Sequence, residues 1–260
     1  DRMPDVVTPV LIEYSTRLIQ SGKEHVSHLH IYSHNLGYAK AVLPHLFSAF
    51  PVRAKKLQIA QVLRPVMMSS LKHFDKATLL GSVQSKLKLK SLDPNQRVCW
   101  LACGLLLLPD KYKHEVFEYT GHSENRRIML SGFLQNAVED ANVSIQSLGA
   151  VTILQLVELL GQDTTPEFPT SGSMYTQAHP TADFVSHLIG VLRDESDRDV
   201  SQQLRALSEL SNLRQWRLAL LQALEGHRIA RLNAQSVLIT PNDVANTLLN
   251  RDPSSAADLA

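Results

Sequence analysis

Histidines supply the first group of residues in this sequence that could do chemistry. Four stand close together: His25, His28, His30 and His34. On a helix, His30 and His34 share one face, and His25 and His28 nearly share another. A zinc site needs two such pairs to converge, and no Cys, Asp or Glu at matching spacing completes the set. We therefore expect surface or interface histidines and no metal site.

Lysine and arginine form three short clusters in the first half of the chain. Their members are Arg53, Lys55, Lys56, Lys86, Lys88, Lys90, Arg126 and Arg127. On a helical scaffold, such clusters could align along one groove and bind the phosphate backbone of a nucleic acid without contacting its bases. Few aromatic residues interleave with them, which argues against stacking of single-stranded bases. Two interpretations stay open: a site for nucleic acid or an acidic partner, and solvated helix faces.

The short motifs of common catalytic and nucleotide-binding sites are missing from the sequence. It has no Gly-x-x-x-x-Gly-Lys-Ser/Thr phosphate loop, no Gly-x-Gly-x-x-Gly fingerprint and no Gly-x-Ser-x-Gly nucleophile elbow. Adjacent carboxylates, at residues 139–140 and 194–195, lie near expected helix ends, where they would act as solvated caps. We therefore predict a chain that is not an enzyme, has no catalytic residues and binds no cofactor.

Charge is distributed unevenly, although the whole chain carries a net charge of only +1. Residues 1–130 contain 18 Lys and Arg against 10 Asp and Glu, whereas residues 131–260 contain 8 against 15. Every lysine lies in the first half. This asymmetry predicts one part with a positive field and one with a negative field. The positive part could meet nucleic acid or an acidic partner; alternatively, the halves attract each other or their neighbours in a longer array.

Composition is typical of a chain that buries a core. The 260 residues are 44% hydrophobic, and 11 Gly with 12 Pro are too few for the turns of a β-sandwich or barrel. No apolar run reaches the roughly 18 residues of a membrane span. The first residues lack a basic region followed by an apolar one, so we expect no signal peptide. Cys99 and Cys103 lie four residues apart on one expected helix. We expect both to be packed in the core as thiols, which fits a reducing compartment. We expect a soluble cytoplasmic fragment of a larger protein, with a processed terminus as the alternative.

The elements that must position these side chains are predicted to be mostly α-helices. Apolar residues recur every three or four positions along most of the chain, as on one face of a helix. Asn35, Asp75 and Asp93 are suitable N-caps, and Pro94 suits the first turn of the helix that follows. These signals place several helix starts in the first hundred residues.

Three further features of the sequence predict how particular helices are divided or packed. Pro65 should divide the helical pattern of residues 52–74. Residues 145–160 are apolar on nearly all sides, which predicts one helix enclosed by others. Trp216 lies on the apolar stripe of a long helix, which favours core packing over an exposed anchor for a partner.

These patterns predict an all-α protein, either an irregular HEAT-like α-solenoid or a helical-repeat bundle, of about 12–14 helices. Helix pairs recur loosely about every 40 residues, the length of a HEAT-type repeat, but their self-similarity is poor. A stretch rich in Gly, Pro, Ser and Thr predicts a loop or linker over residues 161–180. It would separate a basic N-terminal lobe, residues 1–160, from an acidic C-terminal lobe, residues 181–260.

Two stretches resemble helical regions of known proteins. The first begins Leu92-Asp-Pro-Asn-Gln-Arg-Val-Cys-Trp-Leu and continues through Pro109-Asp-Lys-Tyr to Gly132-Phe-Leu; the second begins Pro241-Asn-Asp-Val-Ala. Together they resemble the HEAT-like regions of large bacterial multidomain proteins that carry a NACHT-type or related NTPase module and act in conflict or anti-phage defence. The resemblance covers residues 91–139 and 200–260, and it brings no catalytic residue with it.

The resemblance implies a sensor, scaffold or autoinhibitory superhelix. The chain as a whole is predicted to be a non-catalytic interaction module whose stacked helix pairs bind a protein partner or other domains of the parent chain. The alternative is nucleic-acid binding by the basic first half, which would depend steeply on salt. No membrane partner is expected, and no pattern specifies the oligomeric state.

Overall fold

The computed structural model describes residues 4–26, 29, 35–166, 180–195 and 198–236. These residues are 81% helical and include no strand, which confirms the predicted all-α fold. They contain 11 α-helices of ten residues or more, and the expected number of about 12–14 referred to the whole chain. None of the described helices is both long and apolar enough to cross a bilayer.

The chain divides into two compact units, unit 1 (Asp1–Leu188) and unit 2 (Ile189–Ala260). The division falls inside α11 (Pro180–Arg193), just after the stretch in which a linker was expected. Residues 167–179 of that stretch lie outside the described residues.

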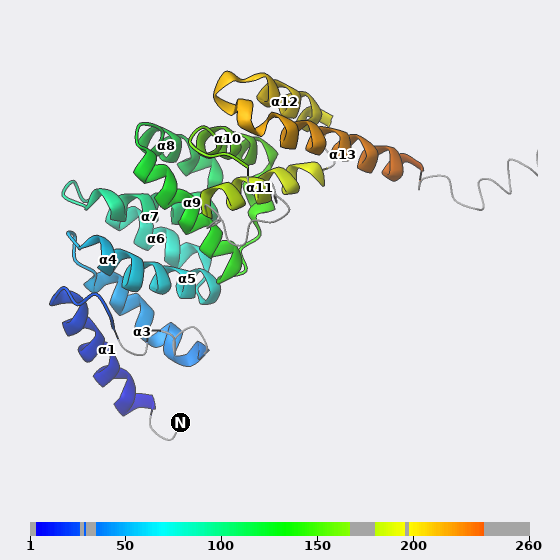
Figure 1. The fold of residues 1–260 in the computed structure, drawn as a ribbon. Helices are drawn as coiled ribbons and strands as arrows, with labels where there is room; N and C mark the ends of the chain where they lie inside the picture. The colour runs from blue at the N-terminus through cyan, green and yellow to red at the C-terminus, as the bar shows by residue number, and fades with distance from the viewer. Residues whose placement is uncertain (1–3, 27–28, 30–34, 167–179, 196–197, 237–260) are drawn as a thin grey trace, which may run out of the picture. The chain divides into compact units, whose positions relative to one another are not determined.

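In unit 1 the helices follow one another in chain order, from the blue α1 to the green α10 of Figure 1. Their bounds are α1 (Pro4–Gln20), α3 (Leu36–Ala49), α4 (Lys56–Gln58), α5 (Arg64–His73), α6 (Lys76–Leu87), α7 (Pro94–Leu107), α8 (Pro109–Gly121), α9 (Glu124–Glu139) and α10 (Ala150–Gly161). α1 packs against α3, α3 against α5 and α6 against α7, and α7 also contacts α8 and α9. Eleven of the 14 residues of α7 are buried, so the core of unit 1 lies along this helix.

The predicted N-caps set where three of these helices begin. Asn35, Asp75 and Asp93 each accept a backbone N–H of the helix that follows. Asp93 Oδ1, for example, accepts hydrogen bonds from Asn95 N at 2.8 Å and Gln96 N at 3.2 Å. Each side-chain oxygen thereby satisfies donors that have no partner within the first turn of a helix.

Residues 145–160 do not form the single helix that their composition predicted. A 3-10 turn covers Ile145–Leu148, and α10 begins only at Ala150. Gly149 separates the two with a φ of 78°, a conformation that residues with a Cβ rarely adopt. The predicted enclosure is confirmed for most of α10, including Leu154, which is 5% exposed.

Both cysteines are buried on α7, and neither forms a disulfide, as predicted. Burial raises the pKa of the Cys99 thiol and raises that of Cys103 to about 12. Because the thiolate is the reactive form, a thiol reagent such as DTNB should leave both cysteines unmodified in the folded chain at mildly alkaline pH. Unfolding in denaturant should make both thiols reactive toward DTNB at the same time. Prompt reaction of the native chain with DTNB would contradict their burial.

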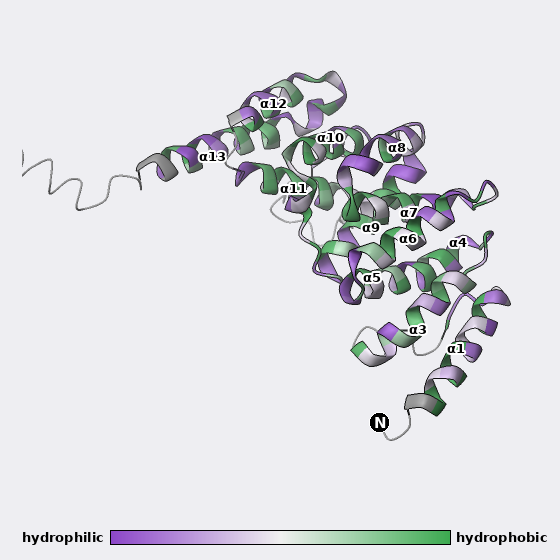
Figure 2. Ribbon diagram, turned by 180° about the vertical axis from the view of Figure 1, so that it is seen from behind, coloured by the Kyte–Doolittle hydropathy of each residue, from purple (hydrophilic) through white to green (hydrophobic). Residues whose placement is uncertain are grey.

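Unit 2 contains α12 (Arg198–Glu209), the 3-10 turn η3 (Ser211–Trp216) and α13 (Arg217–Ser236). α12 packs against both α13 and η3, and Figure 2 shows hydrophobic and hydrophilic residues interspersed along α12 and α13. Trp216 is fully buried, which confirms its predicted place in a core. It is, however, the last residue of η3 and lies directly before the long helix. Within η3 the backbone leaves helical geometry at Leu213 (φ −114°, ψ 16°).

Candidate anion-binding pocket

A π-helical turn between α4 and α5 shapes the candidate site. Ile59–Leu63 form this turn, in which Arg64 N donates to Ile59 O across five residues. Pro65 accounts for its position, because a proline has no N–H to donate and its ring crowds the carbonyl four residues earlier. A wider turn relieves both problems. The expected division at Pro65 is therefore corrected: the helical path continues through this segment with one residue added to a turn.

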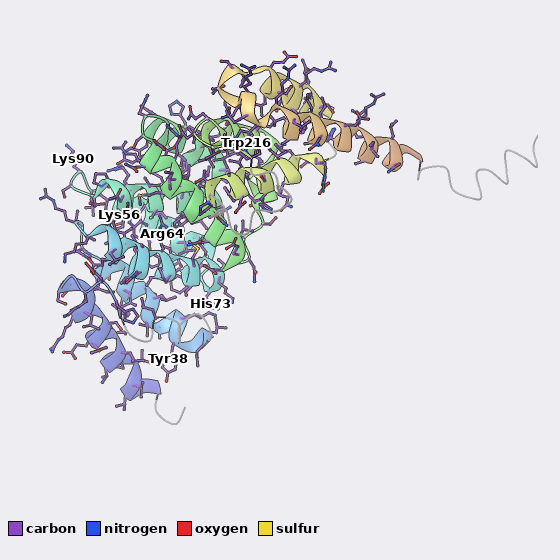
Figure 3. The ribbon with its side chains drawn as sticks, viewed as in Figure 1. Tyr38, Lys56, Arg64, His73, Lys90 and Trp216 are labelled. Carbon is purple, nitrogen blue, oxygen red and sulfur yellow. The ribbon has the colours of Figure 1, made fainter. Side chains whose placement is uncertain are left out.

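The π turn brings Lys56 and Arg64 to one side of the helix. In a regular α-helix, residues eight apart point about 80° away from each other. Once the wider turn absorbs one residue, they stand like residues seven apart, which lie within about 20° of one another. Figure 3 shows them on the same helical segment, with Lys90 on a separate loop.

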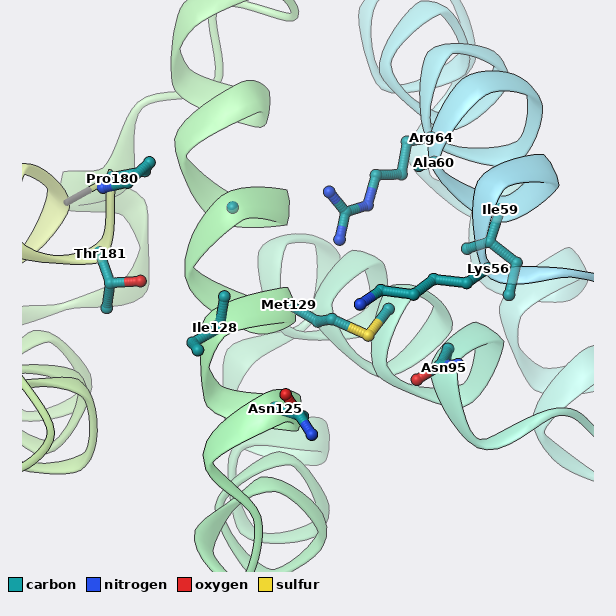
Figure 4. A pocket seen from close by; sticks show the side chains of 11 residues that line it. Lys56, Ile59, Ala60, Arg64, Asn95, Asn125, Ile128, Met129, Pro180 and Thr181 are labelled. Atoms are coloured by element: carbon teal, nitrogen blue, oxygen red, sulfur yellow. The ribbon is translucent and has the colours of Figure 1, made fainter. Parts of the chain in front are cut away.

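A pocket of about 580 Å³ opens between α4–α5, α7 and α9, and we call it the Lys56–Arg64 pocket. The lining residues that matter for binding are two cations, two amides and two apolar side chains: Lys56, Arg64, Asn95, Asn125, Ile128 and Met129. None of the described lining residues is acidic. In Figure 4 the Lys56 and Arg64 side chains reach toward α9, whereas Pro180 and Thr181 lie beyond that helix. The pocket is therefore positively charged where the two cations converge.

Arg64 lies in this pocket without a carboxylate partner among the described residues. Its Nε is buried and has no hydrogen-bond partner there. Burial raises the pKa of the neighbouring Cys99 thiol, and the Arg64 guanidinium acts in the opposite direction through its charge and a hydrogen bond to the thiol. Across the pocket, a Cβ on Gly132 would lie 3.7 Å from Arg64 Nη1, which is an ordinary van der Waals contact, so the guanidinium packs close to this face of α9. A buried donor without an acceptor costs free energy until water or a ligand satisfies it.

Of the eight basic residues singled out from the sequence, only Lys56 lines this pocket. Four others are exposed and lie outside it: Arg53, Lys55, Lys88 and Lys90. Lys55 has an acidic neighbour, with its Nζ 3.6 Å from Glu24 Oε1. All four side chains are exposed at the surface of unit 1, Lys55 as one partner of this ion pair.

Lys86 and Arg126 hold neighbouring segments together. Lys86 Nζ donates to Phe50 O at 3.0 Å, at the end of α3, and burial lowers the pKa of this ammonium. Arg126 Nη1 donates to Tyr119 O at 3.0 Å, and its guanidinium covers the Tyr119 ring at 4.1 Å. Backbone carbonyls therefore take up part of the donor capacity of both side chains.

Arg127 is the most enclosed of the eight, at 9% exposed. Its Nε pairs with Asp163, which follows α10, and its Nη1 donates to Gly121 O at the end of α8. A cation at the C-terminal end of a helix offsets the partial negative charge there. Arg127 therefore connects α8, α9 and the end of α10 rather than facing the pocket.

Sequence reasoning missed Arg64 because it stands alone rather than in a basic cluster. The signal that could have found it is Pro65, since a proline within a helical pattern predicts a kink or a π turn. Such a turn changes which residues share a face, so Lys56 and Arg64 could have been paired from their spacing.

The clustered histidines do not form a metal site in the part of the chain that is described. Only His25 of the four lies there, and it is exposed; His28, His30 and His34 lie outside it. Within the same residues, no three His, Cys, Asp or Glu side chains are grouped to hold a metal ion.

No protein-family model, curated protein or solved structure matches this chain. Function is therefore inferred from the chemistry of its own residues.

Proposed function

We propose that this chain is a non-catalytic helical interaction module that binds an acidic segment in the Lys56–Arg64 pocket. The segment would belong to a partner protein or to another domain of the parent chain. The observation that carries the proposal is the unbalanced charge of the pocket: two cations and no acidic side chain among the described lining residues. An acidic side chain would meet the outer N–H groups of Arg64, because a guanidinium binds carboxylates and phosphates through paired hydrogen bonds.

The apolar part of the pocket supports a peptide as the ligand. Ile128 and Met129 lie on α9 and line the pocket. In Figure 4 Met129 lies beside Lys56, whereas Ile128 stands on the side of α9 that is further from the two cations. A methionine side chain adapts its shape to different apolar partners. The residues flanking an acidic side chain could therefore be bound here while its charged group meets Lys56 and Arg64.

A solenoid-type arrangement is part of the proposal. It is supported by the contacts between helices near in the chain, such as α1 with α3 and α6 with α7. The contacts of α5 and α7 with α9 are more typical of an irregular bundle, and they place α9 across the pocket from Arg64. A regulatory superhelix of the kind that the sequence resemblance implies would use such a pocket to bind a neighbouring domain.

Fluorescence anisotropy with two labelled peptides tests the proposed function. One peptide carries glutamates among leucine and serine, and the other has glutamine at each glutamate position. We expect only the glutamate peptide to bind, with an affinity that salt weakens. The double charge reversal Lys56→Glu with Arg64→Glu should weaken binding roughly tenfold or more, which corresponds to about 1.4 kcal/mol.

A matched variant distinguishes binding in the pocket from binding to the exposed basic residues outside it. Arg53→Glu with Lys88→Glu makes the same change in net charge at two exposed residues outside the pocket. We expect this variant to retain most of the affinity. Equal losses in the two variants, or equal binding of the glutamine peptide, would contradict the proposal.

Nucleic-acid binding by the basic first half is the second candidate function. The exposure of Arg53, Lys55, Lys88 and Lys90 favours it. It predicts that labelled duplex DNA or single-stranded RNA binds with a steep dependence on salt. The Arg53→Glu with Lys88→Glu variant should then lose more affinity than the pocket variant. Lys86 and Arg127 do not suit this test, because their substitution would also remove the backbone contacts described above.

A further inference from the structure

We infer that the anion bound in the Lys56–Arg64 pocket is a phosphate monoester dianion rather than a carboxylate. The inference rests on the proposed function, because it names the chemical group that the same pocket binds. In the setting of that function, the group would be a phosphorylated serine or threonine side chain within the acidic segment.

Charge balance is the first reason. Lys56 and Arg64 bring two positive charges, and no described lining residue brings a negative one. A single carboxylate would neutralise only one of them, whereas a phosphate monoester carries about −1.5 to −2 at neutral pH. Arg64 is partly buried and Lys56 is exposed, so the cost of an unpaired charge applies to Arg64 alone. A dianion fits the pair better because it attracts both cations more strongly than a monoanion does.

The supply of hydrogen-bond donors is the second reason. The Arg64 side chain is only partly buried, and its guanidinium carries several outer N–H groups in a fixed plane. Lys56 adds an ammonium, and Asn95 and Asn125 add side-chain amides. Three phosphate oxygens accept from more directions than the two oxygens of a carboxylate, which lie in one plane. The donors of this pocket therefore outnumber what one carboxylate satisfies.

The helix ends beside the pocket add little to its positive charge. Asn95 and Asn125 are each the second residue of their helices, α7 and α9. The partial positive charge of these two ends is offset by Asp93, the N-cap of α7, and Glu124, the first residue of α9. Affinity for a phosphate must then depend on the side chains of Lys56 and Arg64, which makes the site testable by substitution.

A second basic pocket, in unit 2, differs from the Lys56–Arg64 pocket because an acidic residue lines it. It has a volume of about 460 Å³, and Arg205, Arg228 and Arg231 line it. Glu225 lines it as well, with its Oε2 4.0 Å from Arg228 Nη1. Part of its charge is therefore balanced within the protein, unlike that of the Lys56–Arg64 pocket.

Three labelled peptides that differ only at one central residue test the inference. That residue is serine, glutamate or phosphoserine, and anisotropy measures binding to the full chain. We expect the phosphoserine peptide to bind roughly tenfold more tightly than the glutamate peptide, and the serine peptide to bind most weakly. The advantage of phosphoserine should grow as the pH rises through about 6, the second pKa of a phosphate ester. The glutamate peptide is the reference for this comparison, because its carboxylate stays ionised over this range of pH.

Three variants locate the binding. Lys56→Gln with Arg64→Gln should remove the preference for phosphoserine, whereas Arg205→Gln with Arg231→Gln, an equal loss of charge in unit 2, should keep it. Gly132→Leu retains both cations in the chain and adds a bulky side chain whose Cβ lies 3.7 Å from Arg64 Nη1, so it should also block the phosphoserine peptide. A circular dichroism spectrum equal to that of the unsubstituted chain confirms that each variant is folded. If loss of Arg64 unfolds unit 1, Gly132→Leu still tests the pocket, because it retains Arg64.

The outcomes separate the inference from the proposed function. Equal binding of the glutamate and phosphoserine peptides overturns the inference and leaves the proposed function standing. Binding of inorganic phosphate or a nucleoside monophosphate, lost in the pocket variants, without binding of any peptide overturns the proposed function and supports a free phosphate ester as the source. A phosphoserine preference that survives both pocket variants overturns the inference.

Discussion

Replacing Trp216 with alanine is expected to lower the free energy of unfolding of unit 2 by about 3–5 kcal/mol, the usual cost of emptying a buried aromatic site. Trp216 is fully buried at the end of η3, and Leu220 and Ala223 continue the same buried face along α13. Removal of the indole leaves a cavity that the surrounding side chains fill only in part. Because Trp216 belongs to unit 2, the helices of that unit should lose stability.

Hydrogen exchange of the α12 and α13 amides in the full chain measures this change, since it reports the opening of one region at a time. Leu218→Ala is the matched control: Leu218 lies two residues further along and is 53% exposed. Its substitution should change the free energy of unfolding by no more than about 0.5 kcal/mol. Similar small effects for the two variants would show that Trp216 does not lie in a core.

Gly104→Ala is expected to destabilise unit 1 by about 1–3 kcal/mol through overpacking. Gly104 lies in the buried helix α7, where the ring of Tyr112 on α8 covers it. A Cβ at this position would lie 2.8 Å from Tyr112 Cγ, which is too close for two carbon atoms. Because Cγ is near the backbone of α8, relief requires α7 and α8 to move apart. This loss should exceed the roughly 1 kcal/mol that alanine gains over glycine inside a helix.

Gly81→Ala on α6 provides the opposite expectation. Nothing lies within 4 Å of the Cβ that the substitution adds, so only the helix preference of alanine acts. It should stabilise unit 1 by about 0.5–1 kcal/mol. Urea denaturation followed by circular dichroism compares the two variants, and a stabilising effect of Gly104→Ala would contradict the close packing of α7 on Tyr112.

The basic clusters illustrate how far the sequence predicts the candidate site. Eight cations were selected because they were close together in the chain, and only Lys56 lines the pocket. Arg64, its partner there, stands alone in the sequence and was missed. Arg127 was selected, yet the fold uses it to connect helices, through Asp163 and the end of α8. Proximity in the sequence therefore identified charge but not its orientation.

Helix starts, by contrast, were predictable from single residues. Asn35, Asp75 and Asp93 accept backbone N–H groups no more than three residues away, so the signal and the structure occupy the same short segment. The segment of residues 145–160 was less predictable, because a single backbone angle at Gly149 divides it. Hydrophobic spacing reveals which residues are buried, but it does not reveal such an angle.

The sequence by itself determined the all-α class, the N-caps and the burial of Cys99, Cys103 and Trp216, because capping and amphipathic spacing act over a few residues. Only the tertiary structure decided which cations are free to bind a ligand. Lys86 meets Phe50 O, and Arg127 meets Asp163, each across 36 residues of chain. Contacts of that separation depend on how the helices pack, and the same packing leaves Arg64 facing an open pocket.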